Sequence, residues 1–181
     1  MKAPLVFGLL SLSLWATQSP ATDVGESLPA YSLSDDSGQE HTLDDSVRRI
    51  YATIDRKGDK LLDAALQEGA AEQLGAQQAI VIADISDAPG FVKRIIRGSL
   101  EDRPYRTWMD TRGSTRKTLP TRKGGVSLVE LERMQIRAIR SLNSVEEIHS
   151  ALQEALSPLP AAPTEPPPEP STDASPAPEA P

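Results

Sequence analysis

The chain has 181 residues, a length that suits one domain, and a formal net charge of −7 at pH 7 that argues against general nucleic-acid binding. It contains no cysteine, which excludes a disulfide framework, a CxxC redox pair, a thiolate metal site and a cysteine nucleophile. Only two histidines are present, His41 and His149, so few residues are available for a histidine-built metal centre or a Ser-His-Asp triad.

Residues 1–21 are similar to a secretory signal peptide. Lys2 and the amino terminus supply positive charge, residues 3–16 are almost wholly apolar, and Ala21 ends a stretch suited to cleavage. The apolar run is shorter than the ~20 residues that span a membrane. We therefore expect an exported protein, periplasmic or extracellular, with no stable membrane insertion after cleavage. An uncleaved apolar terminus is the alternative.

The predicted domain, residues 22–156, begins with strand and helix patterns in alternation. Residues 31–34 alternate apolar and polar side chains, as a half-buried strand does, and residues 40–43 return after a turn as the second arm of a hairpin. The run 47–54 is rich in strand-forming residues. Apolar spacings of three and four then predict a helix over 59–74.

The middle of the domain continues the alternation. Residues 79–83 are continuously apolar, as in a strand covered on both faces, and residues 105–109 are a further strand candidate. Between them the pattern predicts a short helix over 87–97. That helix is expected to turn three apolar residues inward: Phe91, Ile95 and Ile96.

The end of the domain reads as a hairpin and a helix. Residues 125–131 and 136–139 are its two strands, and Ser144 with Glu147 forms the capping box of a final helix that ends before Pro158. Together the elements predict an α/β domain with a central mixed sheet and helices on both faces.

Residues 157–181 have a different composition. Ten of these 25 residues are proline, four are acidic, and none is basic or aromatic. Such a segment buries too little apolar surface to offset the entropy of ordering, so we expect a disordered, acidic, partly polyproline-II tail. It could be a spacer or a ligand for a partner's groove, although a solvated tail with no specific partner is the simpler interpretation.

Charge is distributed unevenly within the domain. Residues 22–90 carry fourteen acidic and five basic side chains, whereas residues 91–123 carry ten basic and three acidic ones. The basic stretch either forms a surface for an anionic partner or pairs with the acidic half of the same domain. The second explanation is favoured, because a run in the sequence does not establish a patch in space.

The order of these elements over residues 24–156 resembles the thioredoxin-like fold, in particular its redoxin or peroxiredoxin-type branch. The opening 25–43 is similar to the entry of that branch, with a glycine, an apolar-Pro step, a strand, a turn glycine and a leucine. Residues 47–58 resemble the strand that delivers the redox site, and 128–136 resemble the late hairpin. The resemblance implies a central mixed sheet flanked by helices.

The redox motif of that family is absent. Where the family carries CxxC, this chain has Asp55, Arg56, Lys57 and Gly58, so thiol peroxidase, reductase and isomerase activities are excluded.

The family also carries a cis-proline that faces the redox site. Its equivalent is expected at Gly125, preceded by Gly124. Pro120 is the alternative if the loop is extended, and an ordinary trans bond is favoured there.

These positions allow few roles without sulfur. Residues 55–57 at a helix start could bind an anion, although Asp55 is more simply a helix cap. The pair Gly124 and Gly125 could let an extended peptide approach the sheet, or could merely serve a loop. Four other carboxylates lack calcium-loop spacing and are predicted to be turn and cap residues: Asp35, Asp36, Asp44 and Asp45. We expect no catalytic residue, cofactor or metal.

Two functions follow as hypotheses. The first is a redox-inactive thioredoxin-like module that binds or scaffolds a protein or peptide in the bacterial cell envelope. The second is a small-ligand binder or non-thiol enzyme that uses Asp55 to Gly58. A desolvated Asp55 beside a cation in a pocket would favour the second, and an exposed Asp55 with only a capping bond would favour the first.

Overall fold

The computed structural model describes residues 23–66 and 69–154. The predicted signal peptide, 1–21, and the predicted tail, 157–181, lie outside these residues. Within the described ranges, no helix is long and apolar enough to cross a membrane.

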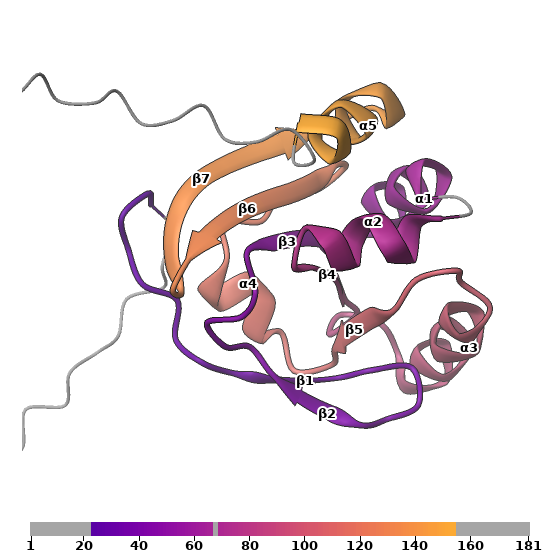
Figure 1. The fold of residues 1–181 in the computed structure, drawn as a ribbon. Coiled ribbons are helices and arrows are strands. Elements are labelled where there is room, and N and C mark those ends of the chain that lie inside the picture. The colour runs from indigo at the N-terminus through magenta and orange to yellow at the C-terminus, as the bar shows by residue number, and fades with distance from the viewer. Residues whose placement is uncertain (1–22, 67–68, 155–181) are drawn as a thin grey trace, which may run out of the picture.

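The core of the described chain is one mixed seven-stranded sheet with the order β2-β1-β5-β4-β3-β6-β7 (Figure 1). The three central strands β3, β4 and β5 are parallel, and the other neighbours pair antiparallel. The strands are β1 (Ser32–Ser34), β2 (Glu40–Thr42), β3 (Arg49–Thr53), β4 (Ala79–Asp84), β5 (Thr107–Asp110), β6 (Val126–Glu132) and β7 (Gln135–Leu142).

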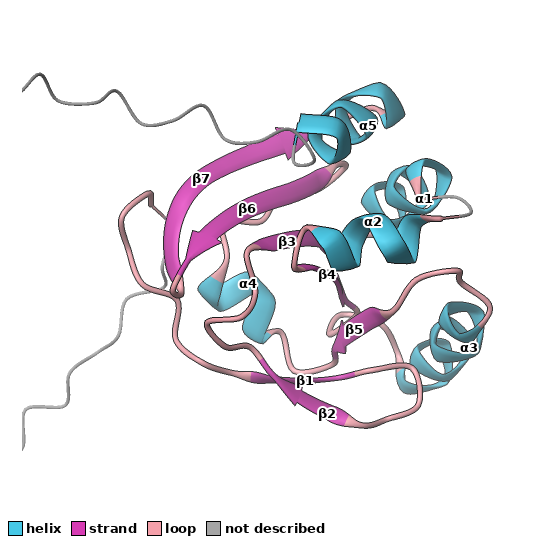
Figure 2. Cartoon of the chain, viewed as in Figure 1, coloured by secondary structure: helices cyan, strands magenta, loops and turns pink. Residues whose placement is uncertain are grey.

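The helices cover both faces of this sheet (Figure 2). They are α1 (Arg56–Ala65), α2 (Ala70–Ala76), α3 (Gly90–Glu101), α4 (Ser114–Thr118) and α5 (Val145–Glu154). The crossovers from β3 to β4 and from β4 to β5 step in the same direction along the sheet. Because such crossovers are right-handed, they place α1, α2 and α3 on one face, with α5 beside α1. The opposite face is covered by α4 and the segment that leads into β3.

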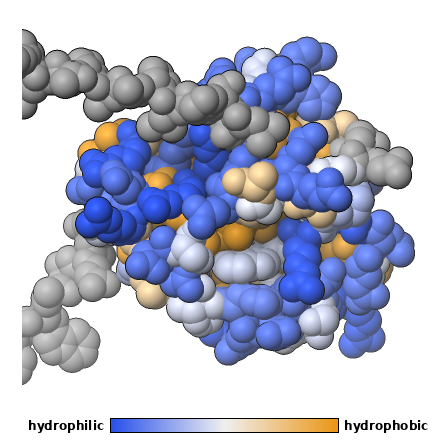
Figure 3. All heavy atoms as spheres, viewed as in Figure 1, coloured by the Kyte–Doolittle hydropathy of each residue, from blue (hydrophilic) through white to orange (hydrophobic). Residues whose placement is uncertain are grey.

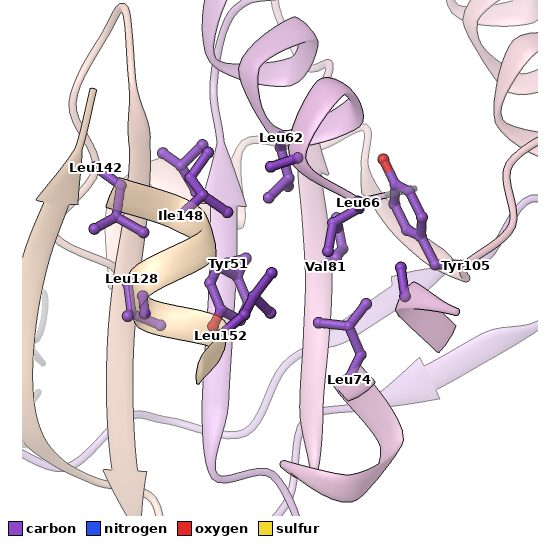
Figure 4. Packing of buried hydrophobic residues seen from close by; sticks show 14 residues of the cluster. Tyr51, Leu62, Leu66, Leu74, Val81, Tyr105, Leu128, Leu142, Ile148 and Leu152 are labelled. Carbon is purple, nitrogen blue, oxygen red and sulfur yellow. The ribbon is translucent and has the colours of Figure 1, made fainter. Parts of the chain in front are cut away.

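Alternation along the central strands divides the core into two layers. On one face Tyr51 and Val81 pack with Leu62, Leu66 and Ile148 from α1 and α5 (Figure 4). On the other face the neighbouring strand residues, Ile50 and Ile82 among them, pack against the segment before β3 through apolar side chains: Leu28, Leu33, Leu43 and Val47. Both faces of β3 and β4 are covered, which explains the continuous apolar run 79–83 of β4.

The predicted helix over 59–74 is in fact two helices. It begins earlier than expected, at Arg56, and α1 ends at Ala65. Gly69 precedes α2 with φ +86°, a left-handed conformation that an α-helix cannot continue through. The apolar spacing continues across the break between the two helices, so the spacing alone does not reveal the break.

The predicted orientation of α3 was wrong for Phe91 and Ile95, whereas Ile96 is half-buried. Phe91 and Ile95 are 71% and 66% exposed, and Leu100 is the buried residue of the helix. The sequence holds two apolar stripes, Phe91 with Ile95 and Val92 with Ile96, and adjacent positions lie on different sides of a helix. Only the second stripe turns toward the sheet, where both of its side chains are half-buried.

Two local features differ from the sequence expectations. The short helix α4 was not predicted; it follows Asp110, whose carboxylate accepts N–H bonds from Arg112, Gly113 and Thr115. The capping box of α5 forms in part. Ser144 Oγ accepts the N–H of Glu147 at 3.2 Å, but the Glu147 carboxylate accepts from the residue before Ser144.

Candidate functional site

The start of α1 is fastened to the loop that precedes β6. Asp55 is the N-cap of α1, as the sequence predicts, and its Oδ1 accepts the Gly58 N–H at 2.9 Å. Its Oδ2 accepts the N–H of Gly124 at 2.6 Å, across 69 residues of sequence. Burial raises the pKa of Asp55, but these backbone N–H bonds outweigh that effect and hold it below its usual value. The carboxylate is therefore charged and fully engaged with backbone.

The glycines of this region serve close internal packing. A Cβ on Gly58 would lie 2.2 Å from the carbonyl oxygen of Gly125. A Cβ on Gly125 would lie 2.8 Å from the carbonyl oxygen of Leu142 and 2.9 Å from Oδ1 of Asn143. The space that a glycine pair leaves open is thus occupied by this chain's own backbone.

The remaining site residues from the sequence lie around this contact. Arg56 and Lys57 are exposed, and the Lys57 side chain lies over Gly124, with Nζ 3.7 Å from where a Cβ on that glycine would be. Pro120 is half-buried in the segment between α4 and β6, and no peptide bond in the described residues is cis. The structure thus brings 55–58 together with 124–125.

Beside Asp55 lies a groove of about 500 Å³ that the sequence did not predict. It is formed by the carboxyl ends of β3 and β4, the start of α1 and the inner side of α3. Ligand sites in open α/β sheets form at this edge. Its apolar lining consists of Ile54, Ala83, Ile85, Ala88, Val92, Ile95 and Ile96. Its polar lining consists of Thr53, Asp55, Arg56, Asp59, Asp84, Asp87, Ser99 and Arg116.

Arg116 of α4 closes one end of the groove by joining three segments. Its Nε donates to the buried carboxylate of Asp84 at 3.0 Å, its Nη2 donates to the carbonyl oxygen of Ile54 at 2.9 Å, and its Nη1 pairs with Asp87. The guanidinium therefore has a partner on each nitrogen. Asp59 pairs with Arg103 and Asp55 accepts backbone N–H bonds, so each of the four carboxylates in the lining has a partner within the domain. The groove therefore offers a ligand chiefly its apolar wall.

The basic stretch 91–123 pairs in part with the acidic half of the domain, as the sequence analysis favoured. Three arginines do so: Arg103 with Asp59 at 2.7 Å, Arg112 with Glu40 at 3.7 Å, and Arg116 with Asp84. Arg94 and Arg97, exposed on α3, form no ion pair with the described residues. Part of the basic stretch thus stays available on the surface.

The carboxylates in the turns before β3 accept hydrogen bonds from residues close to them in the sequence. Asp35 accepts bonds from Ser37, Gln39 and His41, and the bond to His41 is the main reason that the pKa of Asp35 lies well below its usual range. Asp44 accepts the N–H of Ser46. Within residues 23–66 and 69–154 no group of three acidic or histidine side chains is arranged to hold a metal ion.

Comparison with known proteins identifies the fold. No protein-family model and no curated protein matches the sequence. Among solved structures, a peroxiredoxin-like protein from Aquifex aeolicus is similar with a TM-score of 0.50 at 14% identity, covering 76% of this chain and 90% of that one. Peroxidoxin BcpB from Mycobacterium tuberculosis has a TM-score of 0.51 at 12% identity, with 74% and 96% covered. The exposed lipoprotein thioredoxin of Streptococcus pneumoniae has a TM-score of 0.51 at 12% identity, covering 70% of this chain and 99% of that one.

The chain therefore has the thioredoxin-like fold that its sequence resembles, without the cysteines of a thiol enzyme.

Proposed function

We propose that this chain is a redox-inactive thioredoxin-like module that binds a polypeptide segment in the groove between α1 and α3. The observation that carries the proposal is the groove itself. Its wall is apolar, it lies at the carboxyl edge of the central strands, and Ile95 stands two-thirds exposed at its rim. An apolar surface of this kind on a folded domain marks an interaction site.

The absence of sulfur supports a binding role over a redox role. Thiol chemistry needs a thiolate, and this chain has none. At the helix start Asp55 caps α1 and holds Gly124 in place, so this end of the groove is rigid. A rigid, preformed site loses little entropy when a partner is bound.

The alternative, small-ligand binding or non-thiol catalysis at Asp55 to Gly58, is less well supported. Asp55 lines the groove, as this alternative requires. Both of its carboxylate oxygens, however, accept backbone N–H bonds. A general base must be able to receive a proton from a substrate, and Asp55 would have to abandon two structural bonds to do so.

The preferred partner is an acidic segment with an apolar side chain. The apolar side chain would enter the groove beside Ile95 and Ile96, and its acidic neighbours would face Arg94 and Arg97 on α3. Anchoring by one apolar side chain in a pocket, with charges at the rim, is a common mode of protein recognition.

We further propose that the module acts in the cell envelope. Residues 1–21 support this, and one protein of similar fold is named as an exposed lipoprotein. Cell fractionation followed by sequencing of the mature amino terminus tests it. The expected chain starts at Thr22 in the envelope fraction, and an intact chain in the cytosol would contradict export.

Affinity capture from envelope extract tests the binding role. The variant Ile95→Arg fills the rim of the groove with charge, whereas Val24→Arg changes an equally exposed apolar residue elsewhere. A genuine groove ligand is retained by the native chain and by Val24→Arg and is lost with Ile95→Arg. If all three proteins retained the ligand equally, the groove would not be its binding site.

A further inference from the structure

The exposed side of α3 combines two apolar side chains with two arginines that form no ion pair with the described part of the chain. We call Phe91, Arg94, Ile95 and Arg97 the α3 face. Phe91 and Ile95 are one helical turn apart and mostly exposed. Arg94 and Arg97 are exposed and form no ion pair with any described residue. Figure 3 shows a mostly hydrophilic surface with some apolar patches between hydrophilic side chains. The α3 face, which combines exposed apolar and cationic side chains, suits a ligand that is both apolar and acidic.

We propose that the ligand of this face in the free protein is the chain's own C-terminal segment, residues 157–181. The inference uses the same groove as the proposed function and adds an intramolecular occupant for it. The segment has four carboxylates, no basic residue and many apolar Pro and Ala side chains. It therefore has the charge and the apolar content that the α3 face requires.

Charge directs this segment to one region of the domain. Residues 22–90 have a net charge of −9 and residues 124–156 a net charge of −2, whereas residues 91–123 have +7. An acidic segment is attracted to the places where the third range leaves cations exposed and without an ion pair to the described residues. Within 91–123, Arg103, Arg112 and Arg116 already pair with carboxylates of the domain. The cations of α3 are not neutralised in this way.

The segment is long enough to reach the groove. Near the end of α5 the carbonyl oxygen of Leu152 accepts a bond from Gln77, which precedes β4, whereas the groove lies at the far end of β4 beside Asp84. That path spans about 23 Å at ~3.3 Å per strand residue. Ten extended residues beyond Glu154 cover about 31 Å at ~3.1 Å each. Glu165 and Glu169 can therefore stand beside α3.

Two other occupants fit the α3 face less well. In a symmetric pairing of two copies, the α3 face would meet the same face of the other copy, which carries the same two cations. An anionic membrane would be attracted by the arginines but repelled by the exposed carboxylates at both ends of the helix, Asp87 and Glu101. A single strand of polypeptide contacts a narrower surface than a membrane, so its carboxylates can lie beside Arg94 and Arg97, and Asp87 in the groove is already paired with Arg116.

Paramagnetic relaxation in the full chain tests the inference. Because the chain has no cysteine, Ser171→Cys provides one attachment point for a nitroxide spin label. We expect loss of amide intensity at Val92, Ile96 and Arg56, and little loss at Arg133 in the distant β6–β7 turn. The loss should diminish in about 0.5 M NaCl, which screens exposed charges.

A charge-reversed chain, Arg94→Glu with Arg97→Glu, provides the matched variant. It should lose the effect at the groove while its amide spectrum elsewhere stays native. Uniform broadening, or broadening that survives both salt and charge reversal, would overturn the inference. A sample of labelled and isotope-enriched chains mixed together detects contact between copies, and broadening in that sample would assign the face to a second copy.

Failure of this inference and failure of the proposed function are separable. If the spin label shows no contact with α3 while Ile95→Arg still abolishes capture, the groove binds a foreign partner and the tail does not dock. If the tail docks while Ile95→Arg leaves capture of the partner unchanged, the groove binds the tail and not the partner.

Discussion

Gly58 and Gly125 touch through their backbones at the position where the resemblance places the redox site. A Cβ on Gly58 would stand 2.2 Å from the Gly125 carbonyl oxygen, closer than any side chain can approach. The first turn of α1 is therefore packed directly against the loop before β6, and Asp55 fastens the two together.

This contact predicts a reversal of the usual effect of alanine in a helix. Alanine normally stabilises a helix interior by about 1 kcal/mol relative to glycine. Gly58→Ala should instead destabilise the protein by about 1–3 kcal/mol, because the backbone must shift to admit the Cβ. Gly98→Ala is the control, since a Cβ there meets nothing within 4 Å. Urea unfolding of both variants checks the pair, and equal stabilisation by both would contradict the packing.

The same contact predicts that a redox site cannot be restored by replacing the missing residues. Asp55→Cys with Gly58→Cys recreates CxxC in sequence. The second substitution introduces the forbidden Cβ, and the first removes the cap and the bond to Gly124. We expect a destabilised protein without disulfide reductase activity, measured by insulin reduction. A stable and active double variant would show that the site had retained its redox geometry.

Asp55 should make stability dependent on acid. Its pKa is lowered in the folded protein, so its contribution is fully present above the ordinary pKa of about 3.9 and is lost as pH falls through the folded pKa. At about pH 6, Asp55→Ala should cost about 1–2 kcal/mol, as removal of a helix cap does. The difference between native and variant proteins should shrink toward about pH 2. A difference that is constant over this range would exclude the charge as its source.

Arg116 should be more important for stability than an average surface arginine. Asp84 has a fully buried carboxylate, and Arg116 provides its charge partner. Arg116→Ala leaves that charge uncompensated and should destabilise the protein by about 3 kcal/mol. Arg112→Ala is the control, because Arg112 is 75% exposed and 3.7 Å from Glu40, and it should change stability by less than about 1 kcal/mol. Thermal or urea unfolding distinguishes the two.

Several elements could be predicted from the sequence because local pattern and tertiary environment agree. β4 is continuously apolar and is covered on both faces, and α5 begins at the Ser144 cap that its sequence signals. The division of 59–74 into two helices could not be predicted from apolar spacing, because the spacing continues across Gly69. The helix ends at its C-cap, Leu66, which has ψ +81°, and Gly69 with its positive φ precedes the next helix.

The groove escaped prediction for a different reason. The wall of the groove depends on which of the two apolar stripes of α3 faces the sheet. The path of the chain from β4 to β5 sets this rotation of the helix, and the helix sequence alone does not. Arg116 joins the ends of β3 and β4 from a helix that the sequence did not reveal. The resemblance did place residues 55–58 opposite 124–125, where the structure has them in contact.

Site-specific photocrosslinking in living cells can show whether the groove between α1 and α3 binds a polypeptide. A photoreactive phenylalanine analogue at Phe91 stands one helical turn from Ile95 of the groove rim, and the same analogue at Val24 stands on another exposed surface. We expect the probe at position 91 to form an adduct with a polypeptide, either a partner or the chain's own C-terminal segment. We expect no adduct at position 24. No adduct at position 91, or equal adducts at both positions, would contradict the claim that this groove is a polypeptide-binding site.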